Sequence, residues 1–230
     1  MSGIFQDSSF WGVLLSIMAY MLGLHIKNKM KLTVLNPLCI AIIIVICSLI
    51  VFQVDYEAYQ TSSRYITYLL TPATVCLAIP LYERLPLLKN NLNIVLSGIL
   101  IGMLACFFVV LSLSVLFRLT HPMYVTLLLK SVTMAIGVAT VEQLGGYVPI
   151  AASVIIITGI LGNMFAEKIF DFCKIDDPIA KGLALGTASH VIGTAKAMEL
   201  GSVEGAISSL AIVVTGLLTV VFVNAFAVLF

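Results

Sequence analysis

Three basic residues interrupt otherwise apolar stretches of the 230-residue chain: Lys130, His190 and Lys196. A charged side chain inside a membrane segment costs about 3 kcal/mol on insertion scales, and such groups usually have a functional role. Hydroxyl side chains accompany these basic residues in the sequence, namely Thr133, Thr187, Ser189 and Thr194. Cations and hydroxyls together can bind the carboxylate and the hydroxyl or keto oxygen of a small acid. We therefore predict a binding site for a small organic anion.

Further candidate ligands surround two prolines, Pro72 and Pro80. Each proline removes a backbone donor and clashes with the preceding turn, so a helix is expected to break between residues 71 and 80. The candidate ligands at this break are Thr71, Pro72, Ala73 and Thr74.

A second weakly helical stretch contains the tripeptide Gly-Thr-Ala twice, beginning at Gly186 and at Gly193. Glycine inside a helix is destabilising because it loses the most conformational freedom on folding. Both glycines therefore join the candidate site, since they lie beside His190 and its hydroxyl neighbours.

Each candidate also has a structural explanation. Lys196 could pair with Glu199 or extend to the membrane surface, and Lys130 could pair with Glu142. His190 could be a hydrogen-bonded core histidine, and threonines commonly bond back to helix carbonyls. The glycines could serve only to let neighbouring helices approach closely.

The same residues do not indicate catalysis. Ser189 and His190 are adjacent, and neighbours on a helix point about 100° apart, so they are not a nucleophile and its base. The sequence has no H-E-x-x-H or Walker A motif, and its five cysteines show no C-x-x-C spacing. We expect no enzyme activity, no metal and no cofactor, and any transport is then passive or ion-coupled.

The composition indicates a membrane protein. Hydrophobic residues make up 61% of the chain and charged residues 10%, and the mean hydropathy is +1.14. Soluble domains are about one quarter charged. The net charge is +1, with no basic stripe that could bind nucleic acid. The lipid bilayer is therefore the expected surrounding, and nucleic acid is not an expected partner.

The hydropathy pattern contains eight apolar segments: 9–24, 34–53, 64–82, 92–117, 121–143, 147–170, 180–200 and 205–229. About 20 apolar residues cross a membrane. The predicted fold is an all-α, polytopic membrane bundle of about seven to eight segments. The third, fifth and seventh segments are polar and interrupted, so several of them are expected to be broken or re-entrant.

A short motif follows each interrupted segment: a small hydroxyl residue, then glycine, an aliphatic residue and leucine. Its three copies are Ser97–Leu100, Thr158–Leu161 and Thr215–Leu218. Each motif begins about 26 residues after a hydroxyl residue of the preceding segment. Because the apolar segments fill nearly all of the chain, we predict one membrane domain, 1–230. Residues 1–60 would form scaffold helices, and residues 61–230 would form three units of a broken helix followed by a helix.

Broken helices predict an internal cavity, because their unpaired backbone groups cannot face lipid. In secondary transporters, half-helix N-termini at such breaks direct their positive dipole ends at an anionic substrate. The same arrangement is expected here.

The basic loops leave the membrane topology open. His25, Lys27, Lys29 and Lys31 crowd the first loop, which favours a cytoplasmic position for it. The later loop with Lys168, Lys174 and Lys181 falls on the other side if every segment crosses once. One resolution is that an interrupted segment, such as 121–143, enters and leaves on the same face.

Three stretches of the sequence resemble the LrgB/CidB family: Leu69–Tyr82, Lys130–Thr133 and, most specifically, Gly182–Ala197. The resemblance covers essentially the whole chain. Family members often have a proline where this chain has Met134, so a softer break is expected beside Thr133.

The resemblance implies two kinds of function. Bacterial members are described as antiholin-like or holin-like proteins that modulate murein hydrolase export and autolysis, together with a small membrane partner of the LrgA/CidA type. The plant relative resembles a plastid glycolate/glycerate translocator, and bacterial pairs are linked to pyruvate uptake.

From the residues and the resemblance we predict a multi-pass protein of the bacterial cell (inner) membrane that carries small monocarboxylates of the pyruvate, glycolate or glycerate class. Transport would be passive or coupled to protons or Na⁺, with elevator-like alternating access in a homodimer. The alternative is a holin-like or antiholin-like regulator of autolysis that acts with an LrgA/CidA-type partner. Polar interruptions with buried basic residues favour the carrier, because a pore-forming or interacting bundle does not need them.

Overall fold

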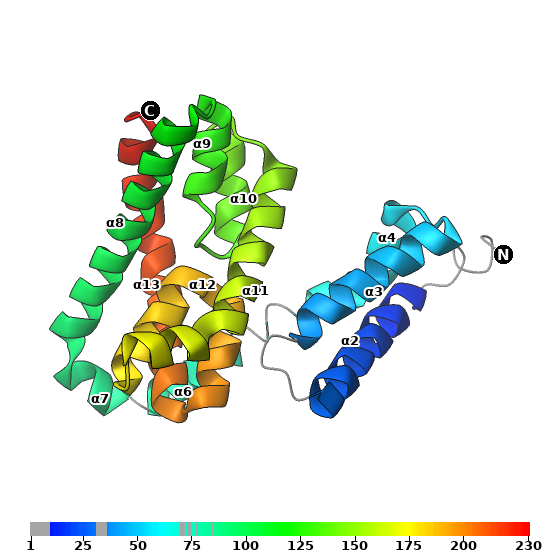
Figure 1. Cartoon of the computed structure of the whole chain (residues 1–230), viewed down its shortest axis with the longest axis horizontal. Helices are drawn as coiled ribbons and strands as arrows, with labels where there is room; N and C mark the ends of the chain where they lie inside the picture. The colour runs from blue at the N-terminus through cyan, green and yellow to red at the C-terminus, as the bar shows by residue number, and fades with distance from the viewer. Residues whose placement is uncertain (1–9, 31–35, 70–71, 73–74, 77, 84) are drawn as a thin grey trace. The chain divides into compact units, whose positions relative to one another are not determined.

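The computed structural model describes residues 10–30, 36–69, 72, 75–76, 78–83 and 85–230 (Figure 1). Within these ranges the chain forms helices and turns and no strand, which confirms the all-α prediction. The chain divides into two compact units, Met1–Cys76 and Leu77–Phe230, and each is described by itself.

The first unit contains α2 (Trp11–Met30), α3 (Pro37–Phe52) and α4 (Tyr56–Tyr68). The side chain of Asn36 caps α3 by accepting a hydrogen bond from the Leu38 amide at 2.8 Å. Close packing joins α2 to α4, because the Gly12 amide donates to Ser62 Oγ at 3.0 Å. The assignment of residues 1–60 to a scaffold stays a prediction.

The predicted break between residues 71 and 80 falls largely outside the described residues. In the first unit α4 ends at Tyr68, and in the second unit the chain begins with α6 (Ala78–Glu83) and α7 (Leu85–Asn90). The internal repeat, whose first predicted unit begins with this segment, therefore stays a prediction.

Three helices of the second unit are long and apolar enough to cross a membrane: α8 (Leu92–Phe117), α11 (Val148–Cys173) and α13 (Ser202–Ala227). One core cluster joins the beginnings of α8 and α13 through Ile99 and Ile207. Another joins their later turns, through Phe107 and Val223, to Ala151 at the beginning of α11. Hence α8 and α13 run in the same direction, and α11 runs back.

Residues 121–147 form a re-entrant hairpin, called here the first hairpin. Its arms are α9 (His121–Leu128) and α10 (Met134–Gln143), separated by residues 129–133. The Tyr147 amide donates to Thr126 Oγ1 at 2.8 Å, so the chain returns beside the arm by which it entered. The hairpin has the shape that re-entry of segment 121–143 requires (Figure 1). That this segment enters and leaves on the same membrane face stays a prediction.

The expectation of a softer break beside Thr133 is wrong. Thr133 has extended backbone angles (φ −62°, ψ 144°) and is the N-cap of α10. Met134 then occupies the first helical position, where proline is favoured but not required, because the amide there has no partner within the helix. The break is complete without a proline.

Helix α12 (Pro178–Leu200) is also a hairpin, called here the second hairpin. Its backbone leaves the helical region at His190 (φ 41°, ψ −133°). Its two arms face each other closely, since a Cβ placed on Gly193 would lie 2.5 Å from the carbonyl oxygen of Leu185. Both arms pack on the first half of α13, through Gly182 against Glu204 and Thr194 against Ser208.

The two hairpins enter the second unit from opposite ends (Figure 1). The second opens at the end where α8 and α13 begin, and the first opens at the end where α8 and α13 finish. Because the first hairpin re-enters, α11 finishes at the end where α8 begins. Lys89, Lys168, Lys174 and Lys181 therefore share that end, which we call the basic end.

Candidate functional site

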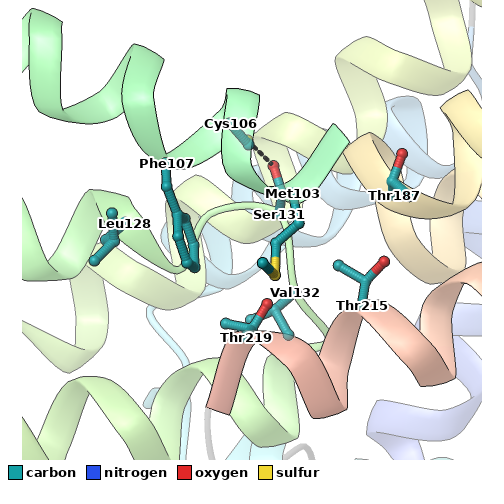
Figure 2. A pocket seen from close by; sticks show the side chains of 9 residues that line it. All are labelled: Met103, Cys106, Phe107, Leu128, Ser131, Val132, Thr187, Thr215 and Thr219. Carbon is teal, nitrogen blue, oxygen red and sulfur yellow. Dashed lines mark hydrogen bonds between the residues drawn. The ribbon is translucent and has the colours of Figure 1, made fainter. Parts of the chain in front are cut away.

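A small cavity lies where the tips of the two hairpins meet α8 and α13 (Figure 2). Its volume is about 10 Å³, room for about one water molecule. It is lined by Met103, Cys106, Phe107, Leu128, Ser131, Val132, Thr187, Thr215 and Thr219. Both hairpins and both parallel helices thus contribute to one site inside the second unit.

The hydroxyl group of Thr215 lacks a hydrogen-bond partner. The residue is 4% exposed, and among the described residues no group hydrogen-bonds to its Oγ1. Figure 2 shows Thr215 and Thr219 projecting from α13 toward the side chains of α8 and the first hairpin. A buried polar group without a partner costs about 1–3 kcal/mol. A ligand or water in the cavity would satisfy the Thr215 hydroxyl.

Lys130 lies at the tip of the first hairpin, beside the cavity. Its Nζ donates to Cys106 Sγ at 3.0 Å and to Ser131 Oγ at 2.9 Å, and both of these residues line the cavity. In the described part of the chain no carboxylate lies within 4 Å of Lys130, so the alternative pairing with Glu142 is not seen there. The ammonium group of Lys130 therefore brings positive charge to the edge of the cavity.

The backbone adds to this positive character. Helix α10 begins at the tip of the first hairpin, and the Thr133 side chain makes no cap hydrogen bond. The returning arm of the second hairpin begins after His190, at the other tip. Helix N-termini carry a partial positive charge, so both tips favour an anion between them.

His190 is held by α11 rather than by the cavity lining. Its Nε2 lies 3.0 Å from the carbonyl oxygen of Ile155, to which it donates. Asn163 Nδ2 donates to the carbonyl oxygen of Ile192 at 3.1 Å, so α11 fixes the tip on both sides. His190 is 4% exposed and has a positive φ, which is strained for a residue other than glycine. This placement matches the core-histidine explanation.

Lys196 lies near the open end of the second hairpin, paired with two carboxylates. Its Nζ is 2.6 Å from Glu167 Oε1 and 3.2 Å from Glu199 Oε2, and its side chain is 12% exposed. The pair with Glu167 ties the returning arm to α11. The structure therefore brings Lys196 together with acids at the basic end and not with the cavity.

The other hydroxyls of the second hairpin serve different contacts. Thr187 lines the cavity and also donates to the carbonyl oxygen of Leu183 at 2.7 Å, the back-bonding expected of threonine in a helix. Thr194 Oγ1 lies 2.6 Å from Ser208 Oγ, within the interface with α13. Ser189 is buried against Gly162 of α11.

Gly186 and Gly193 permit close packing of the backbone. A Cβ on Gly186 would lie 2.6 Å from the carbonyl oxygen of Ser208 on α13, and one on Gly193 would meet the facing arm. Both positions match the structural explanation for glycines in membrane helices.

Four predicted ligands belong to the interrupted segment around residue 72. Thr71, Ala73 and Thr74 lie outside the described residues. Pro72 is described and exposed, in the first unit. Their proposed role in binding stays a prediction.

Several cavity residues were not predicted from the sequence: Met103, Cys106, Phe107, Leu128, Ser131, Val132, Thr215 and Thr219. A signal existed for Thr215 and Thr219, because hydroxyls four residues apart share one face of a helix. No comparable signal existed for Cys106, which is separated from Lys130 by a full helix and a turn.

The second unit and part of the first are covered by similarity to known proteins. The model of the LrgB-like family matches residues 16–229. Holin-like protein CidB of Staphylococcus aureus strain Mu50 is 33% identical over 218 residues, which is 95% of each chain. Holin-like protein CidB of Staphylococcus epidermidis strain RP62A is 34% identical over the same length and coverage. No solved structure is significantly similar to this chain.

Proposed function

The chain belongs to the LrgB-like family of multi-pass bacterial membrane proteins, and on that premise we propose that it is a secondary carrier for small monocarboxylates. The observation that carries this proposal is the cavity between the hairpin tips, where Lys130 lies at the edge and the Thr215 hydroxyl lacks a partner. A carboxylate would accept from Lys130, and the hydroxyl or keto oxygen of pyruvate, glycolate or glycerate would bond to Thr215.

The hairpin arrangement supports alternating access. A hairpin that enters from each end can open the cavity to its own side while the other stays closed. The cavity has room for about one water, which fits a closed state that must open to admit a two- or three-carbon acid. The C-terminal ends of α9 and of the first arm of α12 reach the same tips, and their carbonyl groups suit a coupling Na⁺ or proton-bearing water.

The basic end is proposed to face the cytoplasm. Cytoplasmic loops are enriched in lysine and arginine, and Lys168, Lys174 and Lys181 gather at this end with Lys89. The second hairpin would then open to the cytoplasm and the first to the outside. A homodimer remains our proposal for the assembly, since a moving core needs a fixed scaffold.

A second candidate function is a holin-like or antiholin-like regulator of autolysis that acts with an LrgA/CidA-type membrane partner. The printed name of the relatives, holin-like protein CidB, favours this candidate. The two candidates are compatible in a cell, because a carrier that alters acid and proton flux can also alter autolysis.

The experiment is transport by the purified full chain in liposomes. A carrier predicts saturable exchange of labelled pyruvate or glycolate against internal unlabelled acid, with no release of an entrapped fluorescent dye. A hole-forming protein predicts release of the dye together with the acid. Absence of exchange for every small acid, while autolysis control in cells is intact, would overturn the carrier.

A further inference from the structure

Cys106 differs from the other cysteines in its surroundings. It lines the cavity and is half-buried, and its Sγ lies 3.2 Å from Ser131 Oγ (Figure 2). The same sulfur accepts a hydrogen bond from Lys130 Nζ at 3.0 Å. In the described part of the chain, Cys173 is exposed at the end of α11 and has no such lysine contact. The sulfur of Cys106 therefore lies beside a cation that can bind the carboxylate of an incoming reagent.

A second observation indicates that a ligand reaches this sulfur. The Thr215 hydroxyl, on the same cavity, is buried and has no partner among the described residues. If an acid bridges Lys130 and Thr215, its carboxylate meets the ammonium group that contacts Cys106 Sγ. The carbon next to the carboxylate then lies beside the sulfur.

We propose that Cys106 is a covalent modification site at which small electrophiles that carry a carboxylate close the cavity. The role of the carboxylate rests on the proposed function. The simplest such electrophile is iodoacetate, a two-carbon monocarboxylate. The thiol proton is lost to solvent, the thiolate attacks the carbon that bears iodine, an S–C bond forms, and the C–I bond breaks. Iodide leaves with the bonding electron pair, so no oxidant or reductant is needed.

The test compares iodoacetate with the neutral analogue iodoacetamide on the purified full chain. Alkylation of each cysteine is followed over time by peptide mass spectrometry. Iodoacetamide is ordinarily the faster reagent toward a thiolate, because iodoacetate carries a like charge. We expect that order at Cys173. At Cys106 we expect iodoacetate to be faster, by about tenfold, because Lys130 attracts the carboxylate.

Variants of Lys130 separate this mechanism from simple exposure of the sulfur. Lys130→Met is expected to slow iodoacetate at Cys106 about tenfold, since the carboxylate of the reagent loses its cation. Lys130→Arg is expected to retain the preference for iodoacetate. The rate at Cys173 should not change in either variant, which controls for the activity of the reagents, and equal unfolding temperatures of the variants and wild type control for folding.

Two results would overturn the modification site: an unreactive Cys106, or a Cys106 with the same reagent preference as Cys173 in wild type. Pyruvate or glycolate provides a separate arm. Slower labelling of Cys106 in their presence supports both proposals. Labelling that depends on Lys130 but is unaffected by every small acid supports the modification site and contradicts the carrier.

Discussion

The two hairpins have the same re-entrant shape, but their tips are built differently. The first hairpin turns through residues 129–133, and its Lys130 contacts only a thiol and a hydroxyl of the cavity lining among the described residues. The second hairpin turns at one residue, His190, and α11 holds both sides of that turn through Ile155 and Asn163.

The difference separates ligand chemistry from structural support. At the first tip the positive charge of Lys130 has no carboxylate partner among the described residues. At the second hairpin the basic groups are satisfied by the protein: His190 bonds to a carbonyl and Lys196 pairs with Glu167. Substitutions in the first hairpin should therefore affect transport, and substitutions in the second should affect stability.

The largest effect is expected for Lys130→Met. It removes the cation proposed to bind the carboxylate, and hydrogen bonds to charged groups contribute about 1.5–3 kcal/mol, so the uptake rate should fall about 100-fold. Uptake per mole of protein in liposomes measures this effect, with Lys130→Arg as the matched control. If Lys130→Met takes up acid at the wild-type rate, the proposed role of the first hairpin tip in ligand binding is wrong.

Thr215→Val tests the unpartnered hydroxyl on the cavity wall. The change keeps the shape of the side chain but removes one proposed ligand bond, so KM for the acid should rise about tenfold. Thermal stability should not fall, because the hydroxyl has no partner in the described structure. The matched control is Ser114→Ala on α8. The Ser114 hydroxyl is also buried and has no hydrogen-bond partner among the described residues, but it does not line the cavity. Equal effects on KM in both variants would contradict the site.

Two substitutions of His190 test whether the second tip is a structural clamp. His190→Ala loses the bond to Ile155 and keeps the strained backbone, whereas His190→Gly loses the same bond and relieves strain of about 1–3 kcal/mol. We expect the glycine variant to unfold at the higher temperature. If both unfold alike and both abolish uptake, His190 has the binding role that the sequence predicted.

Lys196→Met should have the smallest effect. Its carboxylate partners are 40% and 54% exposed, and ion pairs of that kind contribute about 0–1 kcal/mol. Uptake should remain within about threefold of wild type, since the residue does not line the cavity. Uptake as low as that of Lys130→Met would instead assign Lys196 to the transport pathway.

Much of the fold could be predicted from the sequence because apolar length and helix-breaking residues act locally. The predicted ranges 92–117 and 121–143 coincide with α8 and with the two arms of the first hairpin. The glycines around His190 predicted a weakly specified helix there, but not the residue at which the backbone breaks. The boundaries of α2 and α4 were harder to predict from hydropathy. Helix α2, for example, continues through Lys27 and Lys29 beyond its apolar part.

The site was less predictable, because it depends on which side chains meet across elements. Lys130 was singled out from its cost in an apolar segment, and it does adjoin the cavity. The same reasoning selected Lys196, but Glu167, far away in sequence, satisfies that charge. Cys106 and Thr215 line the same cavity only because two helices and two hairpins pack together. No local sequence pattern predicts that packing.

The central claim, that the tip of the first hairpin binds a small carboxylate beside the cavity, is tested most directly by thermal unfolding of the purified protein with and without acid. A ligand that binds only the folded state raises its stability by RT ln(1 + [L]/Kd). Pyruvate or glycolate should raise the Tm of wild type in a concentration-dependent manner and leave Lys130→Met unchanged. No rise with any small acid, or an equal rise in both proteins, would contradict the account.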